Sequence, residues 1–354
     1  MTYRRLHRRQ FVAAMVAATL TPLLTPQSGK ANSSGAIRAM KPPRLRRGDR
    51  VGLISPAGAT FLQEQLDIVA DAVRGLGLVP QLAPHVGDRY GYLAGQDANR
   101  AADMNAFFAD EDIAALLPIQ GGWGSARTLP HLDYDLIRRH PKILVGFSDI
   151  TALLLGIHAK TGLVTFHGPN GLTAWRPNQT DPFRQVLFNG EAVMVQNQPA
   201  PEDGDRLMQV RHRIQTITPG RAEGPLVGGN LSVLSGLVGS PYLPDLDGAI
   251  LFLEDVGEAV YRIDRLLTHL ALAGVFDRLA GVIMGQCPGC EPGAGYGSLT
   301  LEEVLRDHLA PLDIPAWSGA AIGHVEPILT LPIGTRVAID ASDGAIQMLE
   351  AAVV

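Results

Sequence analysis

The stretch Lys142-Ile143-Leu144-Val145-Gly146-Phe147-Ser148-Asp149-Ile150-Thr151 decides the fold, because a buried strand gives way to a helix within it. Residues 143–147 form a short apolar run, which is typical of a parallel strand that is covered on both faces. From residue 149 to residue 160 the apolar period changes, and one helical face carries Ile150, Leu153, Leu154 and Ile157. Gly162 then follows as a helix stop. Ser148 therefore stands at a sharp bend between a strand and a helix.

Ser148 has two interpretations at such a bend. Its hydroxyl is held clear of the backbone, and the helix N-terminus beneath it can stabilise an oxyanion, as in a nucleophile elbow. The usual G-x-S-x-G pattern, however, has its second glycine where this chain has Ile150. A serine that caps the helix is the common alternative, and the local sequence alone favours it.

Two residues far from Ser148 in the sequence change that balance. Glu254 and His324 each follow an apolar stretch directly, and side chains at the ends of strands line a cleft. The order Ser, then acid, then His is one of the orders known for a Ser-His-acid relay. Alternatives stay open at both positions. Glu254 could pair with Arg262, Asp255 or Glu258 could replace it, and His324 could be an ordinary loop histidine.

Together these segments resemble the L,D-carboxypeptidases, the serine peptidases of bacterial murein recycling, whose family also includes the microcin C immunity peptidases. The resemblance covers nearly all of the chain from about residue 43 onwards. It rests on five segments in the family's order: QGGWGSAR at 120–127, GFSD at 146–149, GGNLS at 228–232, the Leu-Glu-Asp segment around Glu254, and the Gly-His pair at 323–324. No single segment is decisive, but the five in this order are highly specific.

The resemblance implies a role for each member of the relay. Ser148 would attack a peptide carbonyl, His324 would take the serine proton, and Glu254 would orient the imidazole and stabilise its charged form. The N–H groups of Asp149 and Gly122 would form the oxyanion hole. A plain turn after a strand is the alternative for the glycine loop, which lacks the G-x-G-x-x-G spacing and a Walker lysine. We therefore expect no nucleotide cofactor.

The resemblance also implies the substrate, a murein tetrapeptide that loses its terminal D-Ala at an L,D amide bond. A free carboxylate needs a cation or a cluster of N–H groups, and the candidates are Arg127, Arg262 and Arg265. Asn230 is a further candidate contact, or a cap of the following helix. The alternatives are an immunity-type peptidase that cleaves the amide of a peptidyl nucleotide, and a non-catalytic two-domain peptide-binding protein. The family further suggests a homodimer.

Composition supports a globular protein. The chain has 354 residues, of which 46% are hydrophobic and 18% charged, so it can bury a substantial core. A formal net charge of −5 gives no reason to expect nucleic acid as a partner.

The N-terminus predicts export rather than fold. Arg8-Arg9-Gln10-Phe11-Val12 is a paired-arginine motif that leads into the apolar residues 13–24, a segment too short to span a bilayer. This order resembles a twin-arginine signal, with cleavage near Ala31. A basic, amphipathic, disordered tail is the alternative. No cysteine directly follows the apolar segment, so we expect a periplasmic protein without a stable membrane anchor.

Cys287 and Cys290 are the only cysteines of the chain. In an oxidising compartment they could form a local disulfide. A redox-active C-x-x-C motif normally opens a helix, whereas the prolines and glycines around this pair predict a loop. One pair cannot complete a four-ligand zinc site. We therefore interpret the pair as structural and expect no metal.

The alternation of apolar runs and amphipathic stretches predicts an α/β fold. Strands are expected at 50–55, 78–82, 113–119 and 143–147, with helices at 62–76, 98–108, 127–139 and 149–160. The predicted organisation is a signal peptide (1–31), a tail (32–42), a doubly wound parallel-sheet domain with the nucleophile (43–171), a linker or insert (172–220), and a smaller, strand-rich α/β domain with Glu254 and His324 (221–354). The active site should lie between the two domains.

Overall fold

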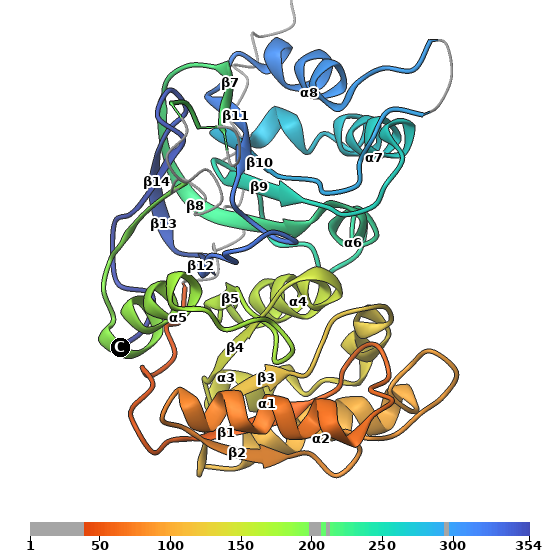
Figure 1. The fold of residues 1–354 in the computed structure, drawn as a ribbon, viewed down its shortest axis with the longest axis vertical. Helices are drawn as coiled ribbons and strands as arrows, with labels where there is room; N and C mark the ends of the chain where they lie inside the picture. The colour runs from red at the N-terminus through yellow and green to blue at the C-terminus, as the bar shows by residue number, and fades with distance from the viewer. Residues whose placement is uncertain (1–38, 198–206, 210–212, 294–296) are drawn as a thin grey trace, which may run out of the picture. The chain divides into compact units, whose positions relative to one another are not determined.

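The computed structural model of the protein describes residues 39–197, 207–209, 213–293 and 297–354. The predicted signal peptide and most of the predicted tail lie outside these residues. The described chain forms two sheets with the strand orders β12-β5-β4-β3-β1-β2 and β6-β14-β13-β8-β9-β10-β11-β7 (Figure 1). The predicted α/β class with a parallel sheet is therefore confirmed. Among the described residues, no helix combines the length and the apolar character needed to cross a bilayer.

The first sheet carries the predicted strand-to-helix bend. Its parallel strands are β1 (Arg50–Ile54), β2 (Val79–Leu82), β3 (Ile113–Pro118), β4 (Ile143–Gly146) and β5 (Thr165–His167). Its helices are α1 (Gln63–Gly75), α2 (Asp97–Ala109), α3 (Tyr134–Arg139) and α4 (Thr151–Thr161). All four residues of β4 are buried, as expected of a strand covered on both faces.

The prediction of one continuous helix over residues 127–139 is wrong, because the structure has a break in the middle of this segment. The structure has a 3-10 helix, η1 (Ser125–His131), then a break, and then α3. Pro130 explains the break, because proline lacks an N–H group and clashes with the preceding turn. Asp133 then caps α3 by accepting a hydrogen bond from the N–H of Leu136.

The second sheet is mixed. Strands β8 (Arg221–Asn230), β9 (Ile250–Glu254), β10 (Gly281–Gly285) and β11 (Ala316–Ala320) run parallel. Antiparallel strands extend both edges: β13 (Arg336–Asp340), β14 (Ala345–Met348), β6 (Met194–Gln196) and β7 (Gln215–Thr218). Its helices are α6 (Leu231–Ser235), α7 (Val260–Leu272) and α8 (Leu301–Leu309).

Two features do not follow the division read from the sequence. The segment predicted as a linker holds α5 (Pro177–Arg184), the π-helix η3 (Gln185–Asn189) and the edge strands β6 and β7. Strand β12 (Leu331–Ile333) comes from the C-terminal part of the chain but pairs antiparallel with β5 of the first sheet, as Figure 1 shows. The chain therefore crosses back to the first sheet just after His324.

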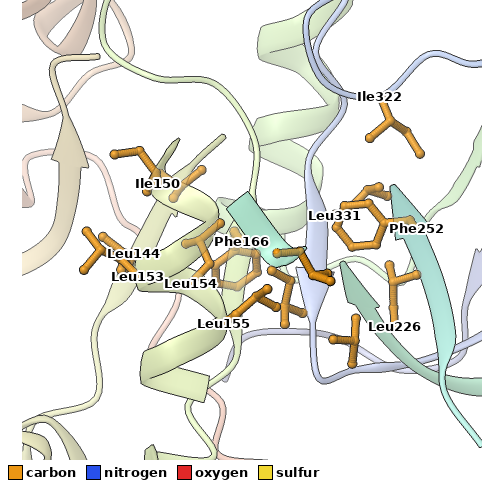
Figure 2. Packing of buried hydrophobic residues seen from close by; sticks show 14 of the residues in the cluster. Leu144, Ile150, Leu153, Leu154, Leu155, Phe166, Leu226, Phe252, Ile322 and Leu331 are labelled. Carbon is orange, nitrogen blue, oxygen red and sulfur yellow. The ribbon is translucent and has the colours of Figure 1, made fainter. Parts of the chain in front are cut away.

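One hydrophobic core joins the two sheets. Buried residues of both belong to a single cluster. In Figure 2, Phe166 of β5 and Leu331 of β12 lie close to Phe252 and Leu226 of the second sheet. Groups that the two sheets contribute to a common site are thus held by shared packing.

Candidate active site

Ser148 occupies the bend between β4 and α4 in a strained conformation. Its φ is 63°, in the left-handed region that residues with a side chain rarely adopt. It is the first residue of the short 3-10 helix η2 (Ser148–Ile150), and the N-cap residues of η2 and α4 are Phe147 and Ile150. The cap interpretation is therefore not what the structure shows. The hydroxyl is directed to another group.

That group is His324, which in turn contacts Glu254. The Nε2 atom of His324 lies 3.1 Å from the Oγ atom of Ser148, and its Nδ1 atom lies 2.7 Å from Oε2 of Glu254. An ionised carboxylate can only accept a hydrogen bond, so Nδ1 carries the proton and Nε2 is free to accept one from the serine. The three side chains thus form a continuous hydroxyl–imidazole–carboxylate chain.

Close packing fixes the carboxylate in this chain. Glu254 ends β9 and is fully buried. A Cβ atom on Gly323 would lie 2.1 Å from Oε2 of Glu254, and one on Gly285 would lie 3.0 Å from its Cβ atom. The ring of Phe147 meets the ring of His324 edge-on, with their centroids 5.0 Å apart. The relay therefore has little freedom to rearrange.

The glycine loop lies directly against Ser148. A Cβ atom on Gly121 would be 3.0 Å from the Cβ atom of Ser148 and 3.4 Å from the backbone nitrogen of Asp149. The carboxylate of Asp149 accepts a hydrogen bond of 2.7 Å from the N–H of Ser125, which ties this loop to the start of the helix. Gly122 has a φ of 107°, so the loop needs glycine at that position. The two predicted oxyanion donors, Asp149 and Gly122, thus border the same space as Ser148.

A pocket of about 440 Å³ opens at this point. Its walls come from the glycine loop, from the bend at Ser148, from helix α6 and from the segment after β9, and they include Gly122, Trp123, Ser148, Asp149, Asn230, Val233, Leu237 and Asp255. The walls therefore combine apolar side chains with a few polar groups next to the hydroxyl of Ser148, which is the usual make-up of a small-molecule site.

Asn230 lines the pocket and also caps a helix. Its Oδ1 atom accepts a hydrogen bond from the N–H of Val233 in α6, and its Nδ2 atom donates to Asp255. Asp255 is buried and accepts further hydrogen bonds from the N–H and the hydroxyl of Ser232 and from the N–H of Val256. These donors make Asp255 an anchor of the pocket wall, whereas the neighbouring carboxylate of Glu254 is hydrogen-bonded to His324.

The predicted arginine contacts do not line this pocket. Arg127 pairs with Asp97 through Nε and Oδ2 at 2.9 Å, Arg262 pairs with Glu258, and the guanidinium of Arg265 lies over the ring of Tyr261. The charge of each is thus engaged close to its own element. Arg262 is also excluded as a partner of Glu254, an alternative that the sequence left open.

His167 is a residue of this region that the sequence did not single out. It ends β5, is fully buried, and packs edge-on against the rings of Phe147 and Phe252. Burial, with a smaller contribution from the neighbouring imidazole of His324, lowers the pKa of His167 to about 3. It is therefore neutral at physiological pH.

The cysteine pair lies near the segment that follows Glu254. Cys287 and Cys290 form a disulfide, and the carbonyl of Pro288 between them accepts a hydrogen bond from the N–H of Gly257. The structural interpretation of the pair agrees with this arrangement. Within the described ranges, no group of three or more His, Cys, Asp or Glu side chains is placed to hold a metal ion.

Comparison with known proteins decides the family. Residues 51–168 match the LD-carboxypeptidase N-terminal domain, and residues 223–339 match the LD-carboxypeptidase C-terminal domain. The chain belongs to the LD-carboxypeptidase family. The resemblance seen in the five sequence segments is thereby confirmed.

Individual relatives in the family carry two kinds of name. The chain is 38% identical over 309 residues to the probable murein peptide carboxypeptidase of Bacillus subtilis, covering 86% of this chain and 92% of that protein. It is 34% identical over 285 residues to the microcin C7 self-immunity protein MccF of Escherichia coli, covering 73% and 80%. The crystal structure of an MccF-like protein from Bacillus anthracis superposes with a TM-score of 0.77 at 30% identity, covering 88% of this chain and all of that one.

Proposed function

We propose that this LD-carboxypeptidase family member is a serine carboxypeptidase that hydrolyses the L,D amide bond of a murein tetrapeptide and releases the terminal D-Ala. The observation that carries the proposal is the contact of His324 with both Ser148 and Glu254, at 3.1 Å and 2.7 Å. These contacts join residues separated by 176 and 70 positions in the sequence. A relay of this order and geometry is what nucleophilic serine catalysis requires.

The reaction follows from the position of each group. The Oγ atom of Ser148 attacks the carbonyl carbon while Nε2 of His324 takes the hydroxyl proton, and the buried carboxylate of Glu254 stabilises the imidazolium that forms. The N–H groups of Asp149 and Gly122 stabilise the oxyanion of the tetrahedral intermediate. His324 then gives its proton to the leaving amine of D-Ala. Water then attacks the acyl-enzyme while His324 takes a proton from it. His324 returns this proton to the Oγ atom of Ser148 as the acyl group leaves, which regenerates the enzyme.

The substrate assignment is supported by the family and by the murein peptide named for the Bacillus subtilis relative. The immunity-type reaction on a peptidyl nucleotide is the second candidate, and the similarity to MccF favours it. In both reactions Ser148 forms an acyl-enzyme, so the two differ in the leaving group. A non-catalytic binding protein would need neither the strained serine nor the buried carboxylate.

The deciding experiment measures D-Ala release from murein tetrapeptide and from pentapeptide by the purified protein. We expect release from the tetrapeptide, no release by Ser148→Ala, and unchanged release by Ser342→Ala, which alters an exposed turn serine. A fluorophosphonate probe should label the wild type and leave Ser148→Ala unlabelled. Release from the pentapeptide alone would refute the L,D assignment, and cleavage of a peptidyl nucleotide alone would favour the immunity-type reaction.

Two further properties belong to the proposal. The paired arginines and the short apolar segment that follows support export by the twin-arginine route and action in the periplasm. When the protein is produced in a bacterium that has the twin-arginine export pathway, replacing Arg8 and Arg9 by Lys should keep it in the cytoplasmic fraction. The family suggests a homodimer, which sedimentation velocity measures directly.

A further inference from the structure

Four aromatic side chains stand exposed on the loops that follow β1, β2 and β3. They are Phe61, Tyr90, Tyr92 and Trp123, with 58%, 55%, 62% and 54% of their surface exposed. We call these four residues the aromatic patch. In the part of the chain that the structure describes, only one other aromatic side chain, Tyr261, is more than half exposed. Large apolar side chains that gather at the surface mark interaction sites, so the aromatic patch indicates a binding site.

The four rings sit on three loops that hydrogen bonds tie together. Phe61 follows β1, Tyr90 and Tyr92 follow β2, and Trp123 follows β3, so all leave the same edge of the sheet as Ser148. The N–H of Ala59 donates to the carbonyl of Tyr92 at 2.9 Å. This link joins the first two loops before any ligand binds.

The third loop is tied to the first in the same way. The N–H of Gly58 donates to the carbonyl of Gly121 at 3.1 Å, and Nε2 of Gln120 donates to the carbonyl of Ala59 at 2.8 Å. In addition, the guanidinium of Arg89 lies 4.5 Å from the centre of the Phe61 ring. The patch is therefore a preorganised platform, which lowers the entropy lost on binding.

The patch is continuous with the site of reaction. Trp123 lines the pocket together with Ser148. Gly121 lies against Ser148, and the N–H of Gly58 is hydrogen-bonded to the carbonyl of Gly121. Phe61 is three residues along the chain from Gly58 and thus at most about 11 Å from it.

We propose that the aromatic patch binds the saccharide of a glycosylated murein peptide whose scissile bond lies at Ser148. This inference rests on the proposed function and names the form of substrate that the site prefers. The four side chains of the patch carry no formal charge, and flat rings with polar edges stack well on the C–H faces of neutral sugars. A second copy of this chain is the competing occupant, which the experiment distinguishes.

The experiment compares D-Ala release from free tetrapeptide and from disaccharide-tetrapeptide. We expect the wild type to show a kcat/KM at least tenfold higher for the glycosylated substrate, mainly through KM. In the double variant Phe61→Ala/Tyr92→Ala this ratio should fall towards one. Tyr261→Ala removes an equally exposed ring on α7 and should leave the ratio unchanged. Thermal unfolding verifies that each variant is folded.

Each other outcome has a defined meaning. A wild-type ratio of one, or a ratio that the double variant keeps, would overturn the saccharide site. A dimeric wild type that becomes monomeric in the double variant during sedimentation would show that the patch is a contact between copies. If neither substrate releases D-Ala, the proposed function fails. Binding of the disaccharide alone, followed by NMR with wild type and double variant, then decides the inference independently.

Discussion

Replacing Glu254 by Gln tests whether the buried charge, rather than the mere presence of a polar group, drives the relay. The amide of Gln is nearly isosteric with the carboxylate, and its oxygen can still accept the hydrogen bond from Nδ1 of His324. Glu254 is fully buried, and within the described residues its Oε1 atom has no hydrogen-bond partner. The substitution therefore removes a charge while the packing around the side chain is kept.

The expected loss follows from the geometry. The Nδ1–Oε2 distance of 2.7 Å places the centres of the imidazolium and carboxylate charges about 4 Å apart. At an effective dielectric constant of about 20, two unit charges at that distance attract by about 4 kcal/mol. This attraction exists only once His324 has taken the serine proton, so it lowers the barrier rather than the energy of the resting state. At about 1.4 kcal/mol per factor of ten, Glu254→Gln should lower kcat about 1,000-fold.

Steady-state D-Ala release at saturating substrate measures this effect, with thermal unfolding as a test of folding. Glu302→Gln is the matched control, because Glu302 is an exposed glutamate on α8 that pairs with Arg306. It should leave kcat unchanged. The reasoning is refuted if folded Glu254→Gln keeps more than a tenth of the wild-type kcat, since the carboxylate would then contribute too little to belong to the relay.

Three further perturbations test the surroundings of the site. Gly323→Ala places a Cβ atom 2.1 Å from Oε2 of Glu254, at a residue whose φ is 83°. We expect the substitution to lower the unfolding free energy by about 1–2 kcal/mol and to lower kcat more than tenfold. A kcat equal to that of the wild type would contradict this expectation. Cys287→Ser/Cys290→Ser opens a four-residue loop and should lower the unfolding free energy in denaturant titrations by about 2 kcal/mol; a lower kcat would argue against a purely structural pair. For His167, burial lowers the pKa to about 3, so the unfolded state binds the proton more readily than the folded state and wild-type stability falls as the pH drops below about 6.5. His167→Leu should therefore show a weaker decline of its unfolding midpoint between about pH 7 and about pH 4, and equal slopes for the two proteins would rule this out.

The local patterns predicted the elements that carry the site. The apolar run and the stretch after Ser148 correspond to β4 and α4. Helix α4 is buried without a break over residues 151–157, so it is a fully buried helix and not the helix with one apolar face that the sequence predicted. The helix predicted at 62–76 is α1, whose buried residues Leu66, Val69, Ala70 and Val73 repeat at helical spacing. The order of Ser148, Glu254 and His324 indicated the relay, but only the coordinates give the distances between these residues.

Features that depend on distant partners could not be predicted in this way. β6 and β12 have three residues each, too few to show an alternating pattern, and each is a strand only because a neighbour pairs with it. The partners of Arg127 and Arg262 depend in the same way on which carboxylate the fold brings closest. A positive φ at Ser148 could not be predicted either, because a residue with a side chain disfavours it. The bend between β4 and α4 imposes this conformation.

The route of the chain explains how residues of two sheets form one rigid relay. His324 lies between β11 of the second sheet and β12 of the first, so both ends of its loop are fixed by strand pairing. On the other side, the hydroxyl of Thr151, three residues after Ser148, accepts a hydrogen bond of 3.0 Å from the N–H of Asn230 at the end of β8. These links and a common core hold the three groups in place before substrate binds. The entropy lost by ordering their side chains is therefore lost during folding and not during catalysis. The loss expected for Glu254→Gln therefore measures the missing charge and not a disordered site.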